Sequence, residues 1–300
     1  MTTARPPASE APPADTLPAG RSPWADARTR FLRNRAAVVS LVLLAAITLA
    51  CVLGPMLLPN AYDATDWNLL GSPPTWQGWH LFGTDESGRD LLVRTLVGGR
   101  VSLVVGVLAT ALSVSLGVAW GATAGFVGGW VDAWMMRFVD MLYAIPYLLV
   151  AILLVTVFGR DLLLVVLAIS AFSWLDMARV ARGQTLSIKS REYIEAAHAI
   201  GVPTWRIVAQ HVMPNLMGIV VIYASITVPG VILAESVLSF LGLGVQEPMT
   251  SWGVLVHDGA NAMADKPWAI LFPAAALSIT LYCANFIGDG LRDALDPKDR

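Results

Sequence analysis

Residues 101–124 read VSLVVGVLATALSVSLGVAWGATA, and none of these 24 residues carries a charge. A helix rises about 1.5 Å per residue, so this run makes a helix roughly 36 Å long. The hydrocarbon core of a bilayer is about 30 Å thick, which such a helix can cross with some tilt. The stretch therefore predicts a transmembrane helix.

Five more apolar runs lie outward from this one, at residues 37–57, 138–158, 162–180, 217–238 and 268–288. Hydrophobic side chains make up 56% of the 300 residues and charged side chains only 14%. A soluble domain of this length needs more charge to cover its surface. The sequence therefore predicts an all-α polytopic protein with six transmembrane helices in a lipid bilayer. The net charge of −2 predicts no nucleic-acid partner.

The distribution of Lys and Arg predicts the orientation of these helices. With the N-terminus inside, the outer segments hold five of the 20 basic residues, and the inner segments hold the other fifteen. Cytoplasmic loops carry the excess of Lys and Arg, so both termini are expected in the cytoplasm. The outer five are Arg89, Arg94, Arg100, Arg160 and Lys266.

The predicted domain organisation follows from these spans. Residues 1–35 form a cytoplasmic tail, in which the Pro- and Ala-rich residues 1–20 are expected to be disordered rather than to form a signal peptide. Residues 36–290 form the membrane domain, which includes a periplasmic segment at 59–99 and a cytoplasmic loop at 181–216. Residues 291–300 form a second cytoplasmic tail.

Motifs of common enzymes are absent from the sequence. A P-loop needs Gly-Lys-Ser/Thr, and none of the three lysines follows a glycine. The four histidines have no metal-ligand spacing. Cys51 and Cys283 fall within predicted spans, where they are expected to act as small apolar residues. We therefore expect no catalytic residue, no metal and no cofactor bound by this chain.

Three acidic residues fall inside or near the predicted spans, where a charge is costly and marks a candidate functional site. Asp140 lies one helical turn from Arg137, and Asp176 lies one turn from Arg179. This spacing predicts a structural ion pair on each helix. Glu235 has no basic neighbour, so two interpretations stay open: it lies at the outer surface rim, or it forms part of a gate.

Three prolines also fall within predicted spans, at Pro146, Pro229 and Pro273. Each removes a backbone hydrogen bond and can bend its helix, which favours a cavity between helices. A static kink satisfied by neighbouring groups is the alternative. Pro229 and Glu235 are accordingly the candidate gate or lumen residues.

Residues 191–215, REYIEAAHAIGVPTWRIVAQHVMPN, bring charge into this apolar chain and lie between the fourth and fifth spans. Gly201 predicts a left-handed helix cap, and Pro203 can open a second helix. The expected product is a cytoplasmic helical hairpin that docks into a partner's groove. An amphipathic helix on the membrane surface is the alternative. The first helix of the predicted hairpin should have an apolar face, formed by Tyr193, Ile194, Ala197 and Ile200.

This hairpin resembles the EAA loop of permease subunits in binding-protein-dependent ABC importers. Glu195-Ala196-Ala197 is followed, after three residues, by Gly201 and, after nine more, by His211-Val212-Met213-Pro214. Only His211 departs from the usual form, which often has Ile there. The resemblance implies that the loop inserts into a cleft of an ATPase subunit and transmits its motion. The residues expected at this contact are Glu195, Ala196, Ala197, His198, Gly201, Val202, Pro203 and Arg206.

Other segments extend the resemblance over nearly the whole chain: WADARTRFLRNRAAVVSL, HLFGTDESGRDLLVRTLVGGRVSL, ESVLSFLGLGVQEPMTSWG and GDGLRDALDPKDR. They are similar to the C-type membrane subunit of oligopeptide permeases in the peptide/nickel permease family. The resemblance implies an inner (plasma) membrane subunit that moves oligopeptides into the cytoplasm. The implied partners are a homologous second permease subunit, two ABC ATPase subunits that bind ATP and Mg, and an external peptide-binding protein. Dipeptide, nickel and glutathione permeases of the same family remain alternatives.

Two outer motifs have a physical interpretation of their own. In GTDESGRD (83–90), Gly83 and Gly88 permit turns, while Asp85 and Asp90 can cap backbone donors or pair with Arg89. The motif is expected to stiffen the entry to the second span rather than to contact the binding protein. Residues 239–253, SFLGLGVQEPMTSWG, are too short and broken to cross, so they should fold back or line the outer mouth.

Two other classes of protein remain as alternatives to a permease. A channel or ion-coupled transporter is disfavoured because paired midplane charges and inverted repeats are not detectable. A membrane scaffold would use the hairpin to bind a cytoplasmic protein, without ATP-driven flux.

Overall fold

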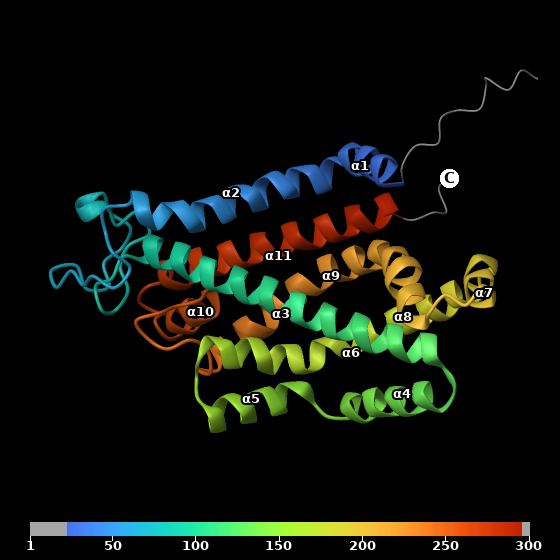
Figure 1. The fold of residues 1–300 in the computed structure, drawn as a ribbon. Helices are drawn as coiled ribbons and strands as arrows, with labels where there is room; N and C mark the ends of the chain where they lie inside the picture. Colours follow the sequence, from blue (N-terminus) through green and yellow to red (C-terminus); the bar gives the residue numbers. More distant parts are fainter. Residues whose placement is uncertain (1–22, 296–300) are drawn as a thin grey trace, which may run out of the picture.

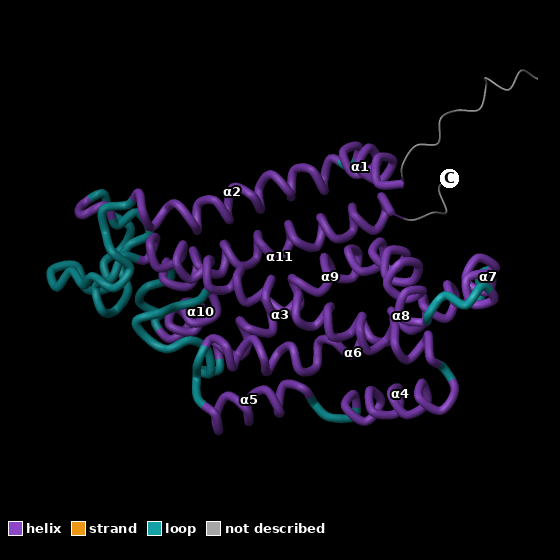
Figure 2. Tube along the Cα trace, in the orientation of Figure 1, coloured by secondary structure: helices purple, strands orange, loops and turns teal. Residues whose placement is uncertain are grey.

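The computed structural model describes residues 23–295, and this part of the chain is helical, with two isolated β-bridges in place of strands (Figure 2). The prediction of an all-α fold is confirmed. The segment expected to be disordered, 1–20, and the last five residues of the expected C-terminal tail lie outside the described residues. The helices are α1 (Pro23–Arg33), α2 (Arg35–Leu57), α3 (Leu91–Val127), α4 (Gly129–Tyr143), α5 (Tyr147–Phe158), α6 (Leu162–Lys189), α7 (Glu192–Ala199), α8 (Thr204–Ile207), α9 (Met213–Phe240), α10 (Trp252–Asn261) and α11 (Trp268–Leu295), with short turns η2 (Gln77–Trp79) and η3 (Val208–Val212).

Five continuous helices of the described chain are long and apolar enough to cross a membrane: α2, α3, α6, the joined residues 204–240, and α11. They run lengthwise through one bundle, in which α3 packs along α6 and α11 packs along α2 (Figure 1). Each covers one of the predicted apolar runs. The helices extend beyond these runs, as in α3, which starts ten residues before the predicted span at 101.

The predicted third span, 138–158, is not one straight helix. It is a pair of helices, α4 and α5, bent by 78° at a short break. Pro146 lies at the break and has extended backbone angles as the residue before α5. Proline has no amide hydrogen and cannot continue the helical hydrogen bonds, which explains why the helix stops here. The bent pair makes a sixth crossing if its two helices count as one span.

Close packing of α3 on α6 depends on glycines spaced four residues apart on α3. A Cβ atom added at Gly117 would lie 2.6 Å from Cβ of Met177, and one added at Gly125 would lie 2.9 Å from the carbonyl oxygen of Arg182. Gly121, between them, also faces α6 backbone. Small residues at this spacing let two transmembrane helices approach closely. This stripe therefore fixes the position of α6, which leads into the predicted hairpin.

The second helix of the predicted hairpin is not a separate element. Helix α8 continues through the π-helical turn η3 into α9, so residues 204–240 form one continuous helix. Helix α6 likewise extends to Lys189. The connection between the two long helices is therefore residues 190–203, which lie within the predicted cytoplasmic loop 181–216. Pro203 precedes this helix at the N-cap rather than lying in its first turn.

The hairpin and the two ends of the described chain lie at the same end of the bundle (Figure 1). Helix α1 and the last turn of α11 are close together there. The loops between α2 and α3 and the short helix α10 lie at the opposite end (Figure 1). The fold therefore separates the hairpin from the GTDESGRD motif by the length of the bundle.

The segment after α9 folds back into the bundle, as predicted. Trp252, at the start of α10, is fully buried, and its Nε1–H donates to the carbonyl of Thr95 at 2.9 Å. Ser251 caps α10 through its hydroxyl group, which accepts from the amide of Val254. The fold-back of α10 thus packs side chains against the first turns of α3.

The two ion pairs predicted within single helices are wrong. Arg179 on α6 pairs with Asp140 on α4 at 2.7 Å and stacks its guanidinium over the ring of Tyr143, 3.9 Å from the centroid. Asp140 therefore joins two helices, and no ion pair to Arg137 or Asp176 occurs among the described residues. The side chain of Asp176 is exposed on α6.

Glu235 does not lie at an outer rim, because its side chain is only 2% exposed. Its carboxylate accepts hydrogen bonds from the hydroxyl groups of Ser102 at 2.9 Å and Ser239 at 2.6 Å, which ties α9 to α3. A gating role for Glu235 and for the buried Pro229 stays a prediction.

Cys51 and Cys283 are buried within the bundle, in agreement with the apolar role expected of them.

Candidate functional site

The hairpin begins with α7, a helix of eight residues whose end is fixed by Gly201. Gly201 has a positive φ of 80°. Its amide donates to the carbonyl of His198, and the amide of Val202 donates to that of Ala197, which is the Schellman pattern of a helix end. The predicted left-handed cap is confirmed. Glu195 lies in the first turn of α7, where a carboxylate interacts favourably with the helix dipole.

Two side chains anchor α7 to the end of the bundle at which the hairpin lies. Ile194 is fully buried and Ala197 is 8% exposed, and both belong to a core cluster with Phe126 of α3, Ile188 of α6 and Ile207 of α8. Ala197 was predicted at the partner contact, but it packs inward. The anchored face is therefore narrower than predicted, since it consists of Ile194 and Ala197.

The tip of the hairpin exposes two large apolar side chains on either side of the turn. Ile200 is 80% exposed and Trp205 is 71% exposed. Ile200 was predicted on the buried face, which is wrong, because α7 ends one residue earlier and the chain turns away from the core. Large apolar side chains gathered at a protruding turn mark an interaction surface.

Sequence reasoning missed Trp205. A signal was available, since Trp205 and Ile200 flank the Gly-Val-Pro turn within the same short segment.

The remaining predicted contact residues lie around this tip. The side chains of Glu195, Ala196, His198 and Arg206 are exposed, as are Gly201 and Pro203, whereas Val202 is half-buried. The His198 ring stacks on Phe126 at a centroid distance of 5.8 Å, so this side chain also braces α7 against α3. The structure therefore brings together six of the eight predicted residues as one exposed surface. Their contact with a partner stays a prediction.

Polar contacts tie the base of the hairpin to neighbouring helices. Lys189, at the end of α6, donates to the carbonyl of Phe126 at 2.5 Å. Arg182 binds both carboxylate oxygens of Asp132 on α4, at 2.5 Å and 2.6 Å. A bidentate pair of this kind fixes orientation as well as distance. A force on the hairpin can therefore reach α3, α4 and α6 as well as the continuous helix 204–240.

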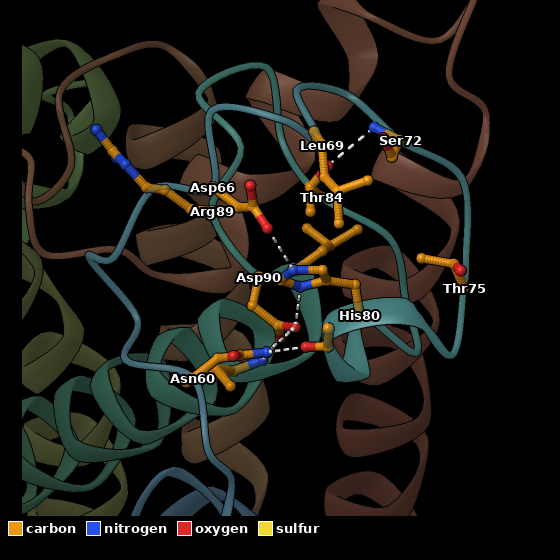
Figure 3. A network of polar contacts seen from close by, with 12 residues as sticks. Asn60, Asp66, Leu69, Ser72, Thr75, His80, Thr84, Arg89 and Asp90 are labelled. Carbon is orange, nitrogen blue, oxygen red and sulfur yellow. Dashed lines mark hydrogen bonds and ion pairs between the residues drawn. The ribbon is translucent and has the colours of Figure 1, made fainter.

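A second cluster of polar side chains lies at the opposite end of the bundle (Figure 3). His80 is buried, and its Nδ1 lies 2.7 Å from Oδ2 of Asp90, while its Nε2 lies 4.0 Å from Asp66. Asn60 donates to the same Asp90 oxygen at 3.1 Å and to the carbonyl of Gly78 at 2.8 Å. The other oxygen of Asp90 caps α3 by accepting from the amide of Val93. One carboxylate thus orients the loop and the start of α3.

The GTDESGRD motif has the structural role predicted for it. Gly83 and Gly88 have positive φ values of 81° and 74°. Asp85 accepts from the amides of Ser87 and Arg89, both within the motif. The hydroxyl group of Thr84 accepts from the amide of Ser72 at 2.8 Å and donates to the carbonyl of Leu69 (Figure 3). These bonds hold a loop without regular secondary structure.

Arg89 pairs with Glu247 rather than with an aspartate of its own motif. Its two terminal nitrogens lie 2.9 Å and 3.0 Å from the two carboxylate oxygens of Glu247. The hydrogen bonds from Arg89 lower the pKa of Glu247 below its ordinary value, and Glu247 in turn raises the pKa of Arg89. The pair joins the loop before α3 to the loop after α9.

Within residues 23–295, no three His, Cys, Asp or Glu side chains are grouped so that they could hold a metal ion. The protruding hairpin is therefore the part of the described chain that best fits a binding site for a partner protein. It lies at the opposite end of the bundle from the polar loops.

Comparison with known proteins identifies the class. The family model described as "Binding-protein-dependent transport system inner membrane component" matches residues 117–300, which is more than half of the chain. The chain therefore belongs to this family. It is a multi-pass inner-membrane transport subunit rather than an enzyme, and it works as part of an ABC transport system with other components.

A second comparison narrows the resemblance. The family model described as "N-terminal TM domain of oligopeptide transport permease C" matches residues 22–74. The oligopeptide transport system permease protein OppC of Escherichia coli (strain K12) is 60% identical over 94% of this chain and 93% of its own length. The OppC protein of Haemophilus influenzae is 55% identical over 94% and 90%. The dipeptide permease protein DppC of Bacillus subtilis is 44% identical over 92% and 86%. The resemblance to C-type oligopeptide permease subunits is confirmed.

Proposed function

We propose that this chain is a permease subunit of an ATP-driven importer that moves oligopeptides into the cytoplasm. The substrate class rests on the relatives, since the proteins of E. coli and H. influenzae that share more than half of its residues are named oligopeptide permeases.

The proposed topology has six crossings, with both termini and the hairpin in the cytoplasm. The broken pair α4–α5 supplies the third crossing. Support comes from the shared position of the hairpin and both ends of the described chain at one end of the bundle (Figure 1). The excess of Lys and Arg in the segments at that end favours the cytoplasm.

The hairpin is proposed to dock into an ABC ATPase subunit, which binds ATP and Mg. The exposed Ile200 and Trp205 at its tip are the observation that carries this proposal. They enter an apolar cleft, while Glu195 and Arg206 make polar contacts at its edge. Because residues 204–240 form one helix, a displacement of the tip moves α9 directly. Work is done on the permease only if this contact differs between its two conformations.

The other proposed partners complete the importer. A homologous second permease subunit covers part of the exposed apolar surface of the bundle, and a second ATPase serves that subunit. An external peptide-binding protein delivers cargo to the end that holds the polar loops.

Co-purification tests this assignment. The tagged native protein is extracted in mild detergent, and every accompanying chain is identified by mass spectrometry. We expect ATPase subunits and a second six-span protein with the native chain, and loss of the ATPases with Glu195→Arg. Glu86→Arg, at a side chain that is 74% exposed in the loop before α3, makes the same change of charge at the other end of the bundle and is the matched control. Absence of any ATPase from the native preparation would contradict the proposal and favour a channel or scaffold.

A further inference from the structure

Asp176 is an acidic residue near the inner end of the predicted span 162–180, and its side chain is exposed. It lies 14 residues from the start of α6 and one turn before Arg179. A carboxylate at this depth is costly in contact with lipid, and such residues face a cavity or another protein group. The position therefore requires a polar environment on this side of α6.

No basic side chain of the described residues pairs with Asp176. Arg179, one turn away, is held by Asp140 at 2.7 Å and by the ring of Tyr143. The Tyr223 hydroxyl group on α9 is close enough to the Asp176 carboxylate to interact with it. Tyrosine supplies a hydrogen bond but no positive charge. The negative charge of Asp176 is therefore left without a counter-ion from this part of the chain.

Asp176 lines a cavity of about 210 Å³ that also borders the break between α4 and α5. Its walls include Tyr143, Tyr147, Phe172 and Ser173. Aromatic faces and a carboxylate are the groups that bind an organic cation. The size of the cavity suits an amino-acid side chain or a peptide terminus rather than a whole oligopeptide.

The break in the helix is a second indication that this side of the bundle does not face lipid. Helix α4 ends at Tyr143, α5 begins at Tyr147, and Pro146 between them has no amide hydrogen to donate. Irregular backbone at membrane depth occurs where it is buried in protein or lines a water-filled cavity. In transporters, substrate sites form at such breaks in membrane helices.

We propose that Asp176 binds the side-chain ammonium groups of lysine-containing peptides as they pass along the face of the bundle formed by α4, α5, α6 and α9. Tyr223 orients the carboxylate, and the ring of Tyr147 flanks the bound cation. The inference rests on the proposed function, because it names the chemical group of the cargo that this chain itself contacts. It makes Asp176 a determinant of preference among peptides already delivered by the binding protein.

Water accessibility tests the site without any transport. In membranes that contain the complete transporter, Asp176→Cys is treated with a water-soluble maleimide from the cytoplasmic side. Leu49→Cys is the control, because Leu49 is 59% exposed on the uniformly apolar α2 and faces lipid in the proposed arrangement. We expect labelling of Asp176→Cys but not of Leu49→Cys. Failure to label Asp176→Cys would overturn the inference and indicate burial against the second subunit.

Transport then tests the chemistry. Uptake of trilysine and of trialanine is measured with the reconstituted transporter and saturating binding protein, for the native chain, Asp176→Asn and Asp265→Asn. We expect Asp176→Asn to lower trilysine uptake about tenfold more than trialanine uptake, because the amide lacks the charge that attracts the lysine ammonium groups. Asp265→Asn, which removes an exposed carboxylate from the loop before α11, should leave the ratio of the two rates unchanged. Equal loss of both peptides in Asp176→Asn would overturn this inference alone, whereas absence of peptide uptake by the native transporter would contradict the proposed function.

Discussion

Trp205 is the side chain whose removal should weaken the ATPase contact most. It is 71% exposed in the isolated chain. Its burial in a cleft would remove roughly 150 Å² of apolar surface from water, which corresponds to about 4 kcal/mol at about 25 cal/mol per Å². Truncation of aromatic residues at the centre of an interface costs about 2–4 kcal/mol. Trp205→Ala should therefore weaken ATPase binding by about 30- to 700-fold.

The assay is equilibrium binding of the purified ATPase subunit to the permease in nanodiscs, measured for native protein and variant. Trp76→Ala is the matched control, because Trp76 is 81% exposed but lies in the loop at the opposite end of the bundle. The control should bind the ATPase with native affinity. Equal affinities for native protein and Trp205→Ala would refute the conclusion that the hairpin tip enters a cleft.

Three further predictions concern the turn, the helix packing and the outer ion pair. Gly201→Asp should abolish transport but not membrane insertion. Gly201 has φ of 80° and open space around it, so the substitution adds backbone strain of about 1–2 kcal/mol and a charge at the contact with the ATPase, without a steric clash. Uptake at the native rate would contradict this prediction. Gly121→Val should lower the melting temperature because it forces α3 from α6, while Gly230→Val, with nothing within 4 Å, should change it little in a thermal-shift assay. Glu247→Gln should lower the free energy of unfolding by at most about 1 kcal/mol at neutral pH, since the carboxylate is 62% exposed. Because the pKa of Glu247 is lowered in the folded state, the stabilisation by this carboxylate is complete above the ordinary value of 4.5 and disappears at lower pH. A difference in melting temperature that does not change with pH would contradict the ion-pair account.

Much of the fold could be predicted because hydropathy is a local property. Runs such as 101–124 and 268–288 cross a bilayer whatever their neighbours, and the structure has apolar helices there. Gly201 could be assigned as a helix cap for the same reason, since left-handed geometry follows from residue type and position. Where local chemistry decides the structure, the sequence was sufficient.

The errors arose where contacts between distant residues decide the structure. Arg179 is nearer in sequence to Asp176, but it pairs with Asp140, 39 residues earlier, because α4 packs beside α6. Local spacing could not reveal that neighbour. The burial of Glu235 likewise depends on Ser102 of α3.

The hairpin shows the same limit. Helical periodicity assigned Ile200 to the apolar face, but periodicity does not distinguish an apolar residue that packs on its own chain from one kept for a partner. The continuity of α8 with α9 through a π-helical turn was also hidden, since His211 and Pro214 read as the end of a loop. Pro214 instead lies inside this continuous helix, just after the π-helical turn.

The most direct test of the central claim is peptide uptake by proteoliposomes that contain this chain, its permease partner and both ATPases. Radiolabelled trialanine loaded on its binding protein is added outside, and ATP is enclosed within the vesicles. The account predicts accumulation that requires ATP and is lost when Gly201→Asp replaces the native chain. Equilibration of the peptide without ATP, or native accumulation by the Gly201→Asp transporter, would contradict it.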